Sequence, residues 1–395
     1  MSTTIGIGFS QLPDPQKATL QACVQLKNSL NSFETDLIII FASIEYITPE
    51  ILEIIARALK PKRLVGSSTG AIILSEGVTT HGIAIVGINS DEIRCGISAI
   101  TDIVNQDMHA TGFDLAKKAG SDLNLPLREV FITFSEGIEK DNSRFIRGVK
   151  EALGGGFPVI GAISSDDFKY RNLRQFFQDK ILQNSVVGVL FGGTFNIALD
   201  CRHGFKPLGK PRTITRIDEY IIRTIDNKPA VDIYKHFLGP QADQLKNATL
   251  NSHAAMYPLG IYLEEAKQYL LRNIIDILDD GSIVCQGGIP QGAEVHLMIS
   301  NKDSCRQSAV TAAESVKTAL AGKPAKLIMV FESLARHKIL GRSVSGEIRA
   351  IKEILGAAVP IIGMCSYGEI GPFGSLNNIK NVYLHNESIL IVAIA

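Results

Sequence analysis

The clearest chemical pattern in the sequence is Gly-Ser-Ser-Thr-Gly at residues 66–70. It matches the G-x-S-x-G motif of hydrolases, in which a strained turn between strand and helix exposes a nucleophilic serine, here Ser68. No amphipathic helix follows the motif, so the alternative is a tight turn that lets the backbone approach a ligand or a neighbouring strand. Cys365 is a second possible nucleophile, with His385 as its base, although a buried cysteine more often serves packing.

Other common sites are not indicated. Gly6 and Gly8 begin a dinucleotide fingerprint without its third glycine, and the eight histidines are dispersed with no H-E-x-x-H motif. With 40 basic and 40 acidic residues the net charge is zero, which argues against a nucleic-acid partner. The longest apolar runs, such as 37–42 and 389–395, are too short to span a bilayer, so we expect no membrane insertion. The N-terminus shows no secretory signal and the cysteines form no C-x-x-C pair, which predicts a cytoplasmic protein with reduced cysteines.

An internal repeat provides the elements that must position these side chains. Each copy has an opening strand, a Gly- and Ser-rich turn some thirty residues later, and a closing strand. The opening strands are expected at 37–42, 130–135 and 327–332, the turns at 66–70, 161–166 and 363–368, and the closing strands at 82–86, 186–190 and 389–392.

Helices are expected between these elements. In the first copy Thr48 suits an N-cap and Pro49 the first helical position, and an apolar stripe runs along the segment that follows. The stripe comprises Ile51, Leu52, Ile55 and Leu59. The corresponding helices are predicted at 144–153 and 344–355. A further strand and helix precede each opening strand, at 5–9 and 16–30, at 95–99 and 108–119, and at 294–299 and 305–320.

The pattern predicts an α/β protein made of strand-helix-strand-helix-strand-strand units, with mixed sheets covered by helices. Three units are expected at about 1–90, 91–193 and 293–395. They give two domains, 1–200 with two units and 201–395 with a divergent segment, 201–292, followed by the third unit. Within that segment we expect a strand-turn-strand over 212–224 and a helix over 230–237.

The turns at the strand ends are the expected ligand site, because Gly-, Ser- and Asp-rich turns present backbone N–H groups and small polar side chains to a small zwitterion. Purely structural turns are the alternative. The candidate residues are Ser67, Ser68, Thr69, Ser164, Ser165 and Tyr367, with Glu369 and Arg202 as charge partners.

The segment 202–216 adds a local basic patch with no acid. Its basic residues are Arg202, Lys206, Lys210, Arg212 and Arg216. It is either a solvated loop or an anion-attracting surface.

Three stretches resemble the FIST family, with its N-terminal and C-terminal domains together covering essentially the whole chain. They are the turn at 66–70, the stretch 203–209 leading to 226–230, and the run Tyr-Gly-Glu-Ile-Gly-Pro at 367–372 followed by His385 and Asn386. The last of these is the most specific.

The resemblance implies a non-catalytic sensor that binds a small ligand and regulates a separate partner, such as a histidine kinase or a cyclic-dinucleotide signalling enzyme. Its most concrete form resembles the stand-alone haem-binding nitric-oxide sensors, and an amino-acid or other small-metabolite sensor without haem is the alternative. Any haem would be non-covalent, because no C-x-x-C-H motif is present. His203 is the first candidate for the axial ligand, followed by His253 and His385. The sequence leaves the oligomeric state open.

Overall fold

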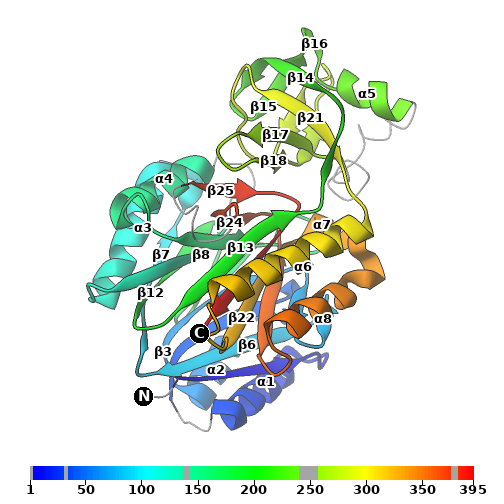
Figure 1. Cartoon of the computed structure of the whole chain (residues 1–395). Coiled ribbons are helices and arrows are strands. Elements are labelled where there is room, and N and C mark those ends of the chain that lie inside the picture. The colour runs from blue at the N-terminus through cyan, green and yellow to red at the C-terminus, as the bar shows by residue number, and fades with distance from the viewer. Residues whose placement is uncertain (1–2, 31–33, 137–141, 240–256, 375–380) are drawn as a thin grey trace.

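The computed structural model describes residues 3–30, 34–136, 142–239, 257–374 and 381–395, and its centre consists of three copies of one α/β unit (Figure 1). The first unit contains β1 (Thr3–Ser10), α1 (Pro15–Leu30), β2 (Thr35–Ala42), α2 (Pro49–Leu59), β3 (Pro61–Ser68), β4 (Ile72–Leu74), β5 (Gly77–Thr79) and β6 (Ile83–Ser90). The second contains β7 (Ile93–Thr101), α3 (Met108–Leu123), β8 (Arg128–Ser135), α4 (Asn142–Leu153), β9 (Val159–Ile163), β10 (Gln175–Phe177), β11 (Lys180–Leu182) and β12 (Ser185–Gly193).

The third unit is interrupted by an inserted domain. It contains β13 (Ile197–His203), α6 (Lys302–Ala319), β22 (Leu327–Ser333), α7 (Leu334–Leu340), α8 (Val344–Leu355), β23 (Ile361–Ser366), β24 (Glu369–Pro372), β25 (Val382–His385) and β26 (Ser388–Ile394). The inserted domain contains β14 (Lys206–Asp218), β15 (Ile221–Ile225), β16 (Lys228–Pro229), α5 (Asp232–Leu238), β17 (Leu259–Leu263), β18 (Gln268–Arg272), β19 (Ile274–Ile277), β20 (Ile283–Cys285) and β21 (Glu294–Ile299). The predicted α/β class with mixed sheets and helical covers is therefore confirmed.

Each unit builds a six-stranded sheet in the same strand order, and the units exchange hairpins. The sheets run β1-β6-β2-β3, β7-β12-β8-β9 and β13-β26-β22-β23. The last two strands in each of these orders are parallel to each other. A hairpin from another unit then completes each sheet: β10-β11 beside β3, β24-β25 beside β9, and β4-β5 beside β23. This cyclic exchange interlocks the units and carries the three turns to one place.

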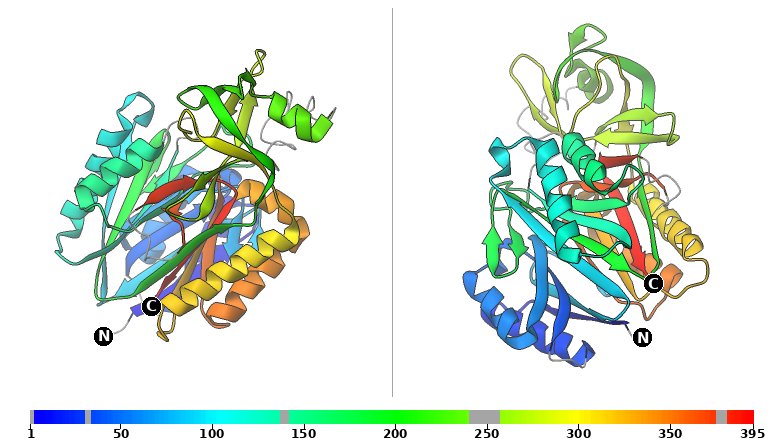
Figure 2. Two further views of the ribbon diagram at one scale, coloured as in Figure 1. Left: turned by 45° about the horizontal axis from the view of Figure 1, so that its top comes forward. Right: turned by 90° about the vertical axis from the view of Figure 1, so that its left-hand side faces the viewer.

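The three sheets enclose the apolar core, and the helices cover their outer faces (Figure 2). Helices α1 and α2 lie on the first sheet, α3 and α4 on the second, and α6 and α8 on the third (Figure 1). The α2 stripe behaves as predicted, because Ile51, Ile55 and Leu59 are buried, and Lys60 ends the helix in the left-handed region. None of the helices in the described ranges has the length and apolar character needed to cross a membrane.

One predicted strand belongs elsewhere. The segment at 294–299, expected to open the third unit, is β21 and pairs with β14 and β17 of the inserted domain. The first strand of the third unit is instead β13, which pairs with β26. Both segments are short apolar strands, so periodicity alone could not show which of them joins the third sheet.

The inserted domain has its own apolar core and lies beyond β24 and β25 (Figure 1). The predicted strand-turn-strand and helix correspond to β14, β15 and α5. The basic segment, for which the sequence allows either a solvated loop or an anion-attracting surface, is mostly strand β14, on which Lys206 and Lys210 are exposed.

Candidate functional site

Three phenylalanines occupy the same position in the three opening strands and meet at the centre of the molecule. Phe41, Phe134 and Phe331 contact one another edge to face, with ring centroids 5.5, 5.9 and 6.4 Å apart. All three are fully buried. They mark an approximate threefold axis, which the ends of β3, β9 and β23 also surround.

The turns after these strands bond to one another in the same way in each copy. The N–H groups of Ser68, Ile163 and Cys365 each donate to a carbonyl of a neighbouring unit at 2.8 Å. The accepting residues are Arg174, Gly368 and Ala71, in that order. The turns are thus held in a closed ring, as the exchange of hairpins requires.

The predicted turn hydroxyls lie together in this ring, and they bond to protein groups. Ser67 and Ser164 share a hydrogen bond of 2.7 Å, and Ser68 donates to the Ser165 carbonyl at 3.0 Å. Thr69 Oγ1 donates to the Cys365 carbonyl at 2.8 Å. These four hydroxyl residues are completely buried, so the ring is a packed structural element.

Neither predicted nucleophile has an activating partner in the described part of the chain. Ser68 Oγ accepts from the Arg174 N–H at 3.1 Å and donates to a main-chain carbonyl. Burial, followed by the charge of Glu332, raises the pKa of the Cys365 thiol far above its usual range. Thiolate or alkoxide chemistry therefore has no base here.

The two predicted charge partners do not meet. Glu369 accepts from the hydroxyls of Ser366 and Ser388 at 2.5 Å each, and burial raises its pKa to about 8. Arg202 instead donates to Asp200 at 3.1 Å, on strand β13, which packs against α6.

The predicted haem ligands are engaged with the backbone. His203 Nδ1 accepts from the Phe205 N–H at 3.1 Å, so Nε2 donates to the Tyr269 carbonyl at 2.8 Å. Burial lowers the pKa of His203 to about 4. His385 is fully enclosed, and its Nε2 bonds to the Gly371 carbonyl at 2.9 Å. His253 lies outside the described residues, and within them no three His, Cys, Asp or Glu side chains form a metal site.

The second unit breaks the threefold pattern with a longer turn. Ala71 and Gly368 each lie three residues beyond the equivalent strand positions Ser68 and Cys365, whereas Arg174 lies eleven beyond Ile163. The additional residues, 166–173, form what we call the long turn. It has no counterpart in the other two units.

Asp166 organises the long turn. Its carboxylate accepts the N–H groups of Lys169, Tyr170 and Arg171 at 2.9, 3.0 and 3.1 Å, and it accepts the hydroxyl of Tyr367. Burial opposes its ionisation, but the Tyr367 hydroxyl and these N–H groups outweigh burial and lower its pKa. Asp166 is therefore an ionised anchor for the turn.

Two aromatic residues of the long turn have unfavourable backbone angles. Phe168 and Tyr170 have φ values of +65° and +54°, a region that bulky side chains rarely adopt. Tyr170 stacks on Tyr367 with centroids 3.9 Å apart, and the Lys338 ammonium lies 3.7 Å from the Phe168 ring centre. Strain of this kind persists only where the surroundings enforce it, and it is concentrated at binding and catalytic sites.

Several glutamates lie close to this turn, around a single arginine. The fully buried Arg336 donates to Glu332 at 3.2 Å and also to Glu347. It further bonds the Cys305 carbonyl at 2.5 Å and the Ser308 hydroxyl at 3.1 Å. Burial raises the pKa of both glutamates. Arg336 thus makes its direct bonds to Glu332 and Glu347, and its charge favours the ionised form of Glu387 without outweighing burial.

Glu332 and Glu347 each leave one oxygen without a hydrogen-bond partner among the described residues, and Glu387 leaves both. Glu387 lies in the turn between β25 and β26 with φ of +56°, and its side chain is completely buried. Neither carboxylate oxygen meets a hydrogen-bond donor among the described residues. The Asn273 amide lies near enough to favour the ionised form, but burial dominates and raises the pKa to about 8. An unpaired buried carboxyl is costly, so the site is incomplete without a further partner.

Glu387 lies where the inserted domain meets the three-unit core. The Arg272 guanidinium bonds the Leu384 carbonyl at 2.9 Å, and the Asn273 N–H bonds the Asn386 side chain at 3.0 Å. Gln286 Nε2 donates to the Tyr367 carbonyl at 2.5 Å. We call this region the junction site, defined by Asp166, Tyr170, Asn273, Tyr367 and Glu387.

Of the junction site, sequence reasoning identified only Tyr367. Tyr170 and Glu387 were missed because a turn residue between two strands normally faces solvent. The available signal was position: Glu387 aligns with Asn184 of the second unit, since the following residues pair identically with their opening strands. Asparagine suits the left-handed region and glutamate does not.

Comparison with known proteins agrees with the sequence resemblance. A model of the FIST N domain matches residues 36–228, and a model of the FIST C domain matches residues 230–372. No curated protein matches the chain.

Solved structures give only distant similarity. A cyanuric acid hydrolase from A. caulinodans has 8% identity and a TM-score of 0.39, over 100% of this chain and 99% of that one. Another cyanuric acid hydrolase has 9% identity and a TM-score of 0.40 over 100% of both chains. A chorismatase has 9% identity and a TM-score of 0.38, over 100% of this chain and 99% of that one.

Proposed function

The chain belongs to the FIST family, whose domains serve as small-ligand sensors in signalling proteins, and we propose that it senses a small polar ligand at the junction site. The ligand carries an amine or another strong hydrogen-bond donor, as an amino acid does. The observation that supports this most directly is Glu387, whose two buried oxygens have no donor in the described part of the chain.

A ligand amine would complete the site by pairing with Glu387. Because the pKa of Glu387 is raised to about 8 by burial, the carboxyl is mostly protonated at pH 7 in the free protein. A cationic amine favours the ionised form, so binding would transfer this proton to solvent. The stacked rings of Tyr170 and Tyr367 supply an aromatic surface beside the carboxyl.

The location of the site offers a way to transmit the signal. Groups of the inserted domain and of the core contact one another directly around Glu387. A ligand held between them acts through its different affinity for two arrangements of the domains. The output passes to a separate partner, a histidine kinase or a cyclic-dinucleotide signalling enzyme.

The proposed role is non-catalytic. It is supported by the main-chain partners of Ser68 and by the burial of Cys365, because neither residue has a base beside it in the described part of the chain. We expect the protein to be inactive in ester-hydrolysis assays. Ester hydrolysis that the Ser68→Ala substitution abolishes would reject the non-catalytic role.

His203 and His385 do not suit haem ligation. His203 uses both ring nitrogens for backbone bonds, and His385 is enclosed with Nε2 bonded to a carbonyl. We therefore propose the sensor without haem. Titration of the purified protein with haemin should give no sharp, stoichiometric Soret band. A stoichiometric band that shifts with nitric oxide, and that His203→Ala removes from a folded protein, would restore the haem assignment.

The direct test is calorimetric titration with the twenty common amino acids and ethanolamine at pH 7, in two buffers of different ionisation enthalpy. We expect at least one amine to bind with release of close to one proton, since the pKa of Glu387 is about 8. Glu387→Gln should bind at least tenfold more weakly and release no proton. Glu314→Gln, an exposed change on α6, is the matched control. Binding that Glu387→Gln leaves intact would reject the junction site.

A further inference from the structure

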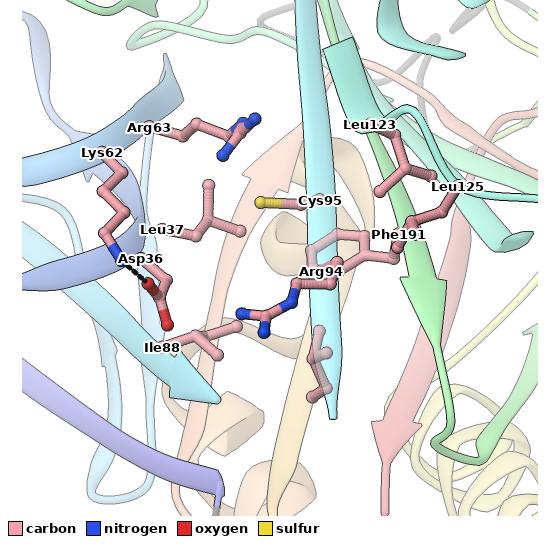
Figure 3. Close-up of a pocket in the computed structure, with 11 residues that line it drawn as sticks. Asp36, Leu37, Lys62, Arg63, Ile88, Arg94, Cys95, Leu123, Leu125 and Phe191 are labelled. Carbon is pink, nitrogen blue, oxygen red and sulfur yellow. Dashed lines mark hydrogen bonds and ion pairs between the residues drawn. The ribbon is translucent and has the colours of Figure 1, made fainter. Parts of the chain in front are cut away.

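A separate cavity of about 350 Å³ lies between the first and second units, where their sheets meet near the start of β2 and β3. We call it the first-seam cavity. Its floor is apolar and comprises Leu37, Ile88, Ile93, Cys95, Leu123, Leu125 and Phe191. Three basic residues and Asp36 complete the lining (Figure 3). Its volume falls within the range of small-molecule sites.

The basic residues of the cavity differ in how they are paired. Lys62 pairs with Asp36 at 2.8 Å, and Arg63 pairs with Asp122 at 2.8 Å. Arg94 donates only to the Ser90 carbonyl at 3.1 Å, and no carboxylate in the described ranges lies within ion-pair distance of it. Figure 3 shows its guanidinium extending from β7 toward Asp36 and Ile88 on the facing sheet. Arg94 is therefore the cation available to an anionic ligand.

The threefold repeat shows whether the fold itself requires these cations. Glycines 66, 161 and 363 hold the same register against their opening strands, which aligns the residues before them. Lys62 thus corresponds to Phe157 and Val359, while Arg63 corresponds to Pro158 and Pro360. Phe157 and Val359 pack against apolar core, so the other two seams carry an uncharged side chain where the first carries Lys62.

Arg94, on the other side of the seam, likewise has uncharged counterparts in the other two units. The pairing of β7, β13 and β1 with their closing strands aligns Arg94 with Asn196 and Thr4. The same backbone therefore forms three seams, and the first carries a basic residue at all three of these aligned positions. Like charges so close repel one another, and Arg94 indeed lowers the pKa of Lys62 against the larger effect of Asp36. Arg63 joins the two units through Asp122, whereas Arg94 has no ion pair in the described chain, so a salt bridge across the seam does not account for Arg94.

We propose that the first-seam cavity binds a small organic acid, with its carboxylate on Arg94 and its apolar body against Leu37, Ile88 and Phe191. A guanidinium pairs with a carboxylate through two parallel N–H donors, which fixes the orientation of the acid. Arg94 is the one cation of the lining without an ion pair in the described chain, which fits a single negative charge. The apolar floor fits a hydrocarbon or aromatic body rather than a sugar. This site is independent of the junction site.

The test uses benzoate as the probe, with uncharged benzamide as its isostere, and ¹³C-methyl NMR of the full chain. Benzoate should shift the methyl signals of Ile88 and Ile93 saturably, and benzamide should bind at least tenfold more weakly. Arg94→Asn introduces the residue that the third unit carries here and should weaken benzoate at least tenfold. Arg57→Gln, an exposed change on α2, should leave the affinity unchanged.

Three results would overturn the proposal: no saturable shift, shifts confined to methyl groups outside the cavity, or unchanged affinity in Arg94→Asn. Methyl spectra of the free variant establish that it is folded. Because the probe carries no amine and the cavity shares no residue with the junction site, failure here leaves the proposed sensor function untouched, and the reverse also holds.

Discussion

Positions at which the three units agree differ in character from positions at which they diverge. Phe41, Phe134 and Phe331 are the same residue type in all three units, and they satisfy one another at the axis. The position of Glu387 is instead Asn184 in the second unit and His81 in the first. His81 is exposed and pairs with Glu45, whereas Glu387 is buried with no donor in the described chain. Agreement therefore marks groups that hold the fold. At the diverging position His81 and Asn184 find partners within the fold, and Glu387 has no hydrogen-bond donor among the described residues.

The ring of turns and the junction site show the same contrast at close range. Both are buried and polar, and both lie near the ends of β9 and β23. In the ring, hydroxyls and carbonyls of different units bond one another. At the junction site the long turn is strained and a carboxyl is unpaired. A satisfied polar network stabilises a fold, whereas an unsatisfied one provides binding energy to a ligand.

The largest stability effect is expected at the axis. Phe134→Ala removes a fully buried ring that contacts both of its counterparts, and should lower the free energy of unfolding by about 3–5 kcal/mol. Phe113→Ala, on the partly exposed face of α3, should cost clearly less. Urea unfolding of both variants measures the difference. Equal losses would show that the axis is not the centre of the core.

Glu387→Gln should change how stability depends on pH. In the folded protein its pKa is about 8, above the ordinary 4.5, so the folded state retains a proton that the unfolded state releases. The free energy of unfolding therefore falls as pH rises from 4.5 to 8, by up to about 1.4 kcal/mol per pH unit from this residue. At pH 7 the loss relative to low pH is about 3 kcal/mol.

Glutamine should remove this contribution, so the variant should lose less stability between pH 5 and pH 8 than the parent protein. Glu369, whose pKa is also about 8, should maintain a residual slope in both proteins. Denaturant unfolding across this pH range measures the slopes, with Glu314→Gln as the control. Parallel slopes in Glu387→Gln and the parent would show that Glu387 is not held in its neutral form.

Ser67→Ala tests the ring of turns with a smaller change. It removes the hydrogen bond to Ser164 and leaves a buried hydroxyl without one partner, so we expect a loss of about 1–2 kcal/mol. Ser121→Ala, on the exposed face of α3, should change stability by less than about 0.5 kcal/mol. The double variant Ser67→Ala with Ser164→Ala should show a coupling energy. Additive losses would contradict a direct bond across the units.

The sequence predicted what depends on local pattern. The α2 stripe of Ile51, Ile55 and Leu59 follows from helical period, and the three turns were expected at strand ends because they recur at one position of the repeat. Two other features depend on contacts between distant segments. The exchange of hairpins and the use of β13 in place of β21 are pairings that no local period encodes.

The site residues divide along the same line. Ser67 and Ser164 were visible as a repeated motif, but their saturation with hydrogen bonds appears only in the folded ring. The burial of Glu387 requires the inserted domain, which covers a turn that otherwise faces water. The basic residues of the first-seam cavity become informative only when Lys62 is aligned with Phe157 and Val359 through strand register.

The smallest stability effect is expected where divergence is greatest. Arg94 is exposed and bonds one carbonyl, so Arg94→Asn should alter the free energy of unfolding by less than about 0.5 kcal/mol. The same variant should lose the rise in melting temperature that benzoate gives the parent protein, since only the folded cavity binds the acid. Thermal unfolding with and without benzoate measures both effects. A loss of stability comparable to that of Ser67→Ala would instead assign Arg94 to the fold, and a diverging position would then serve the same purpose as the phenylalanines on the axis.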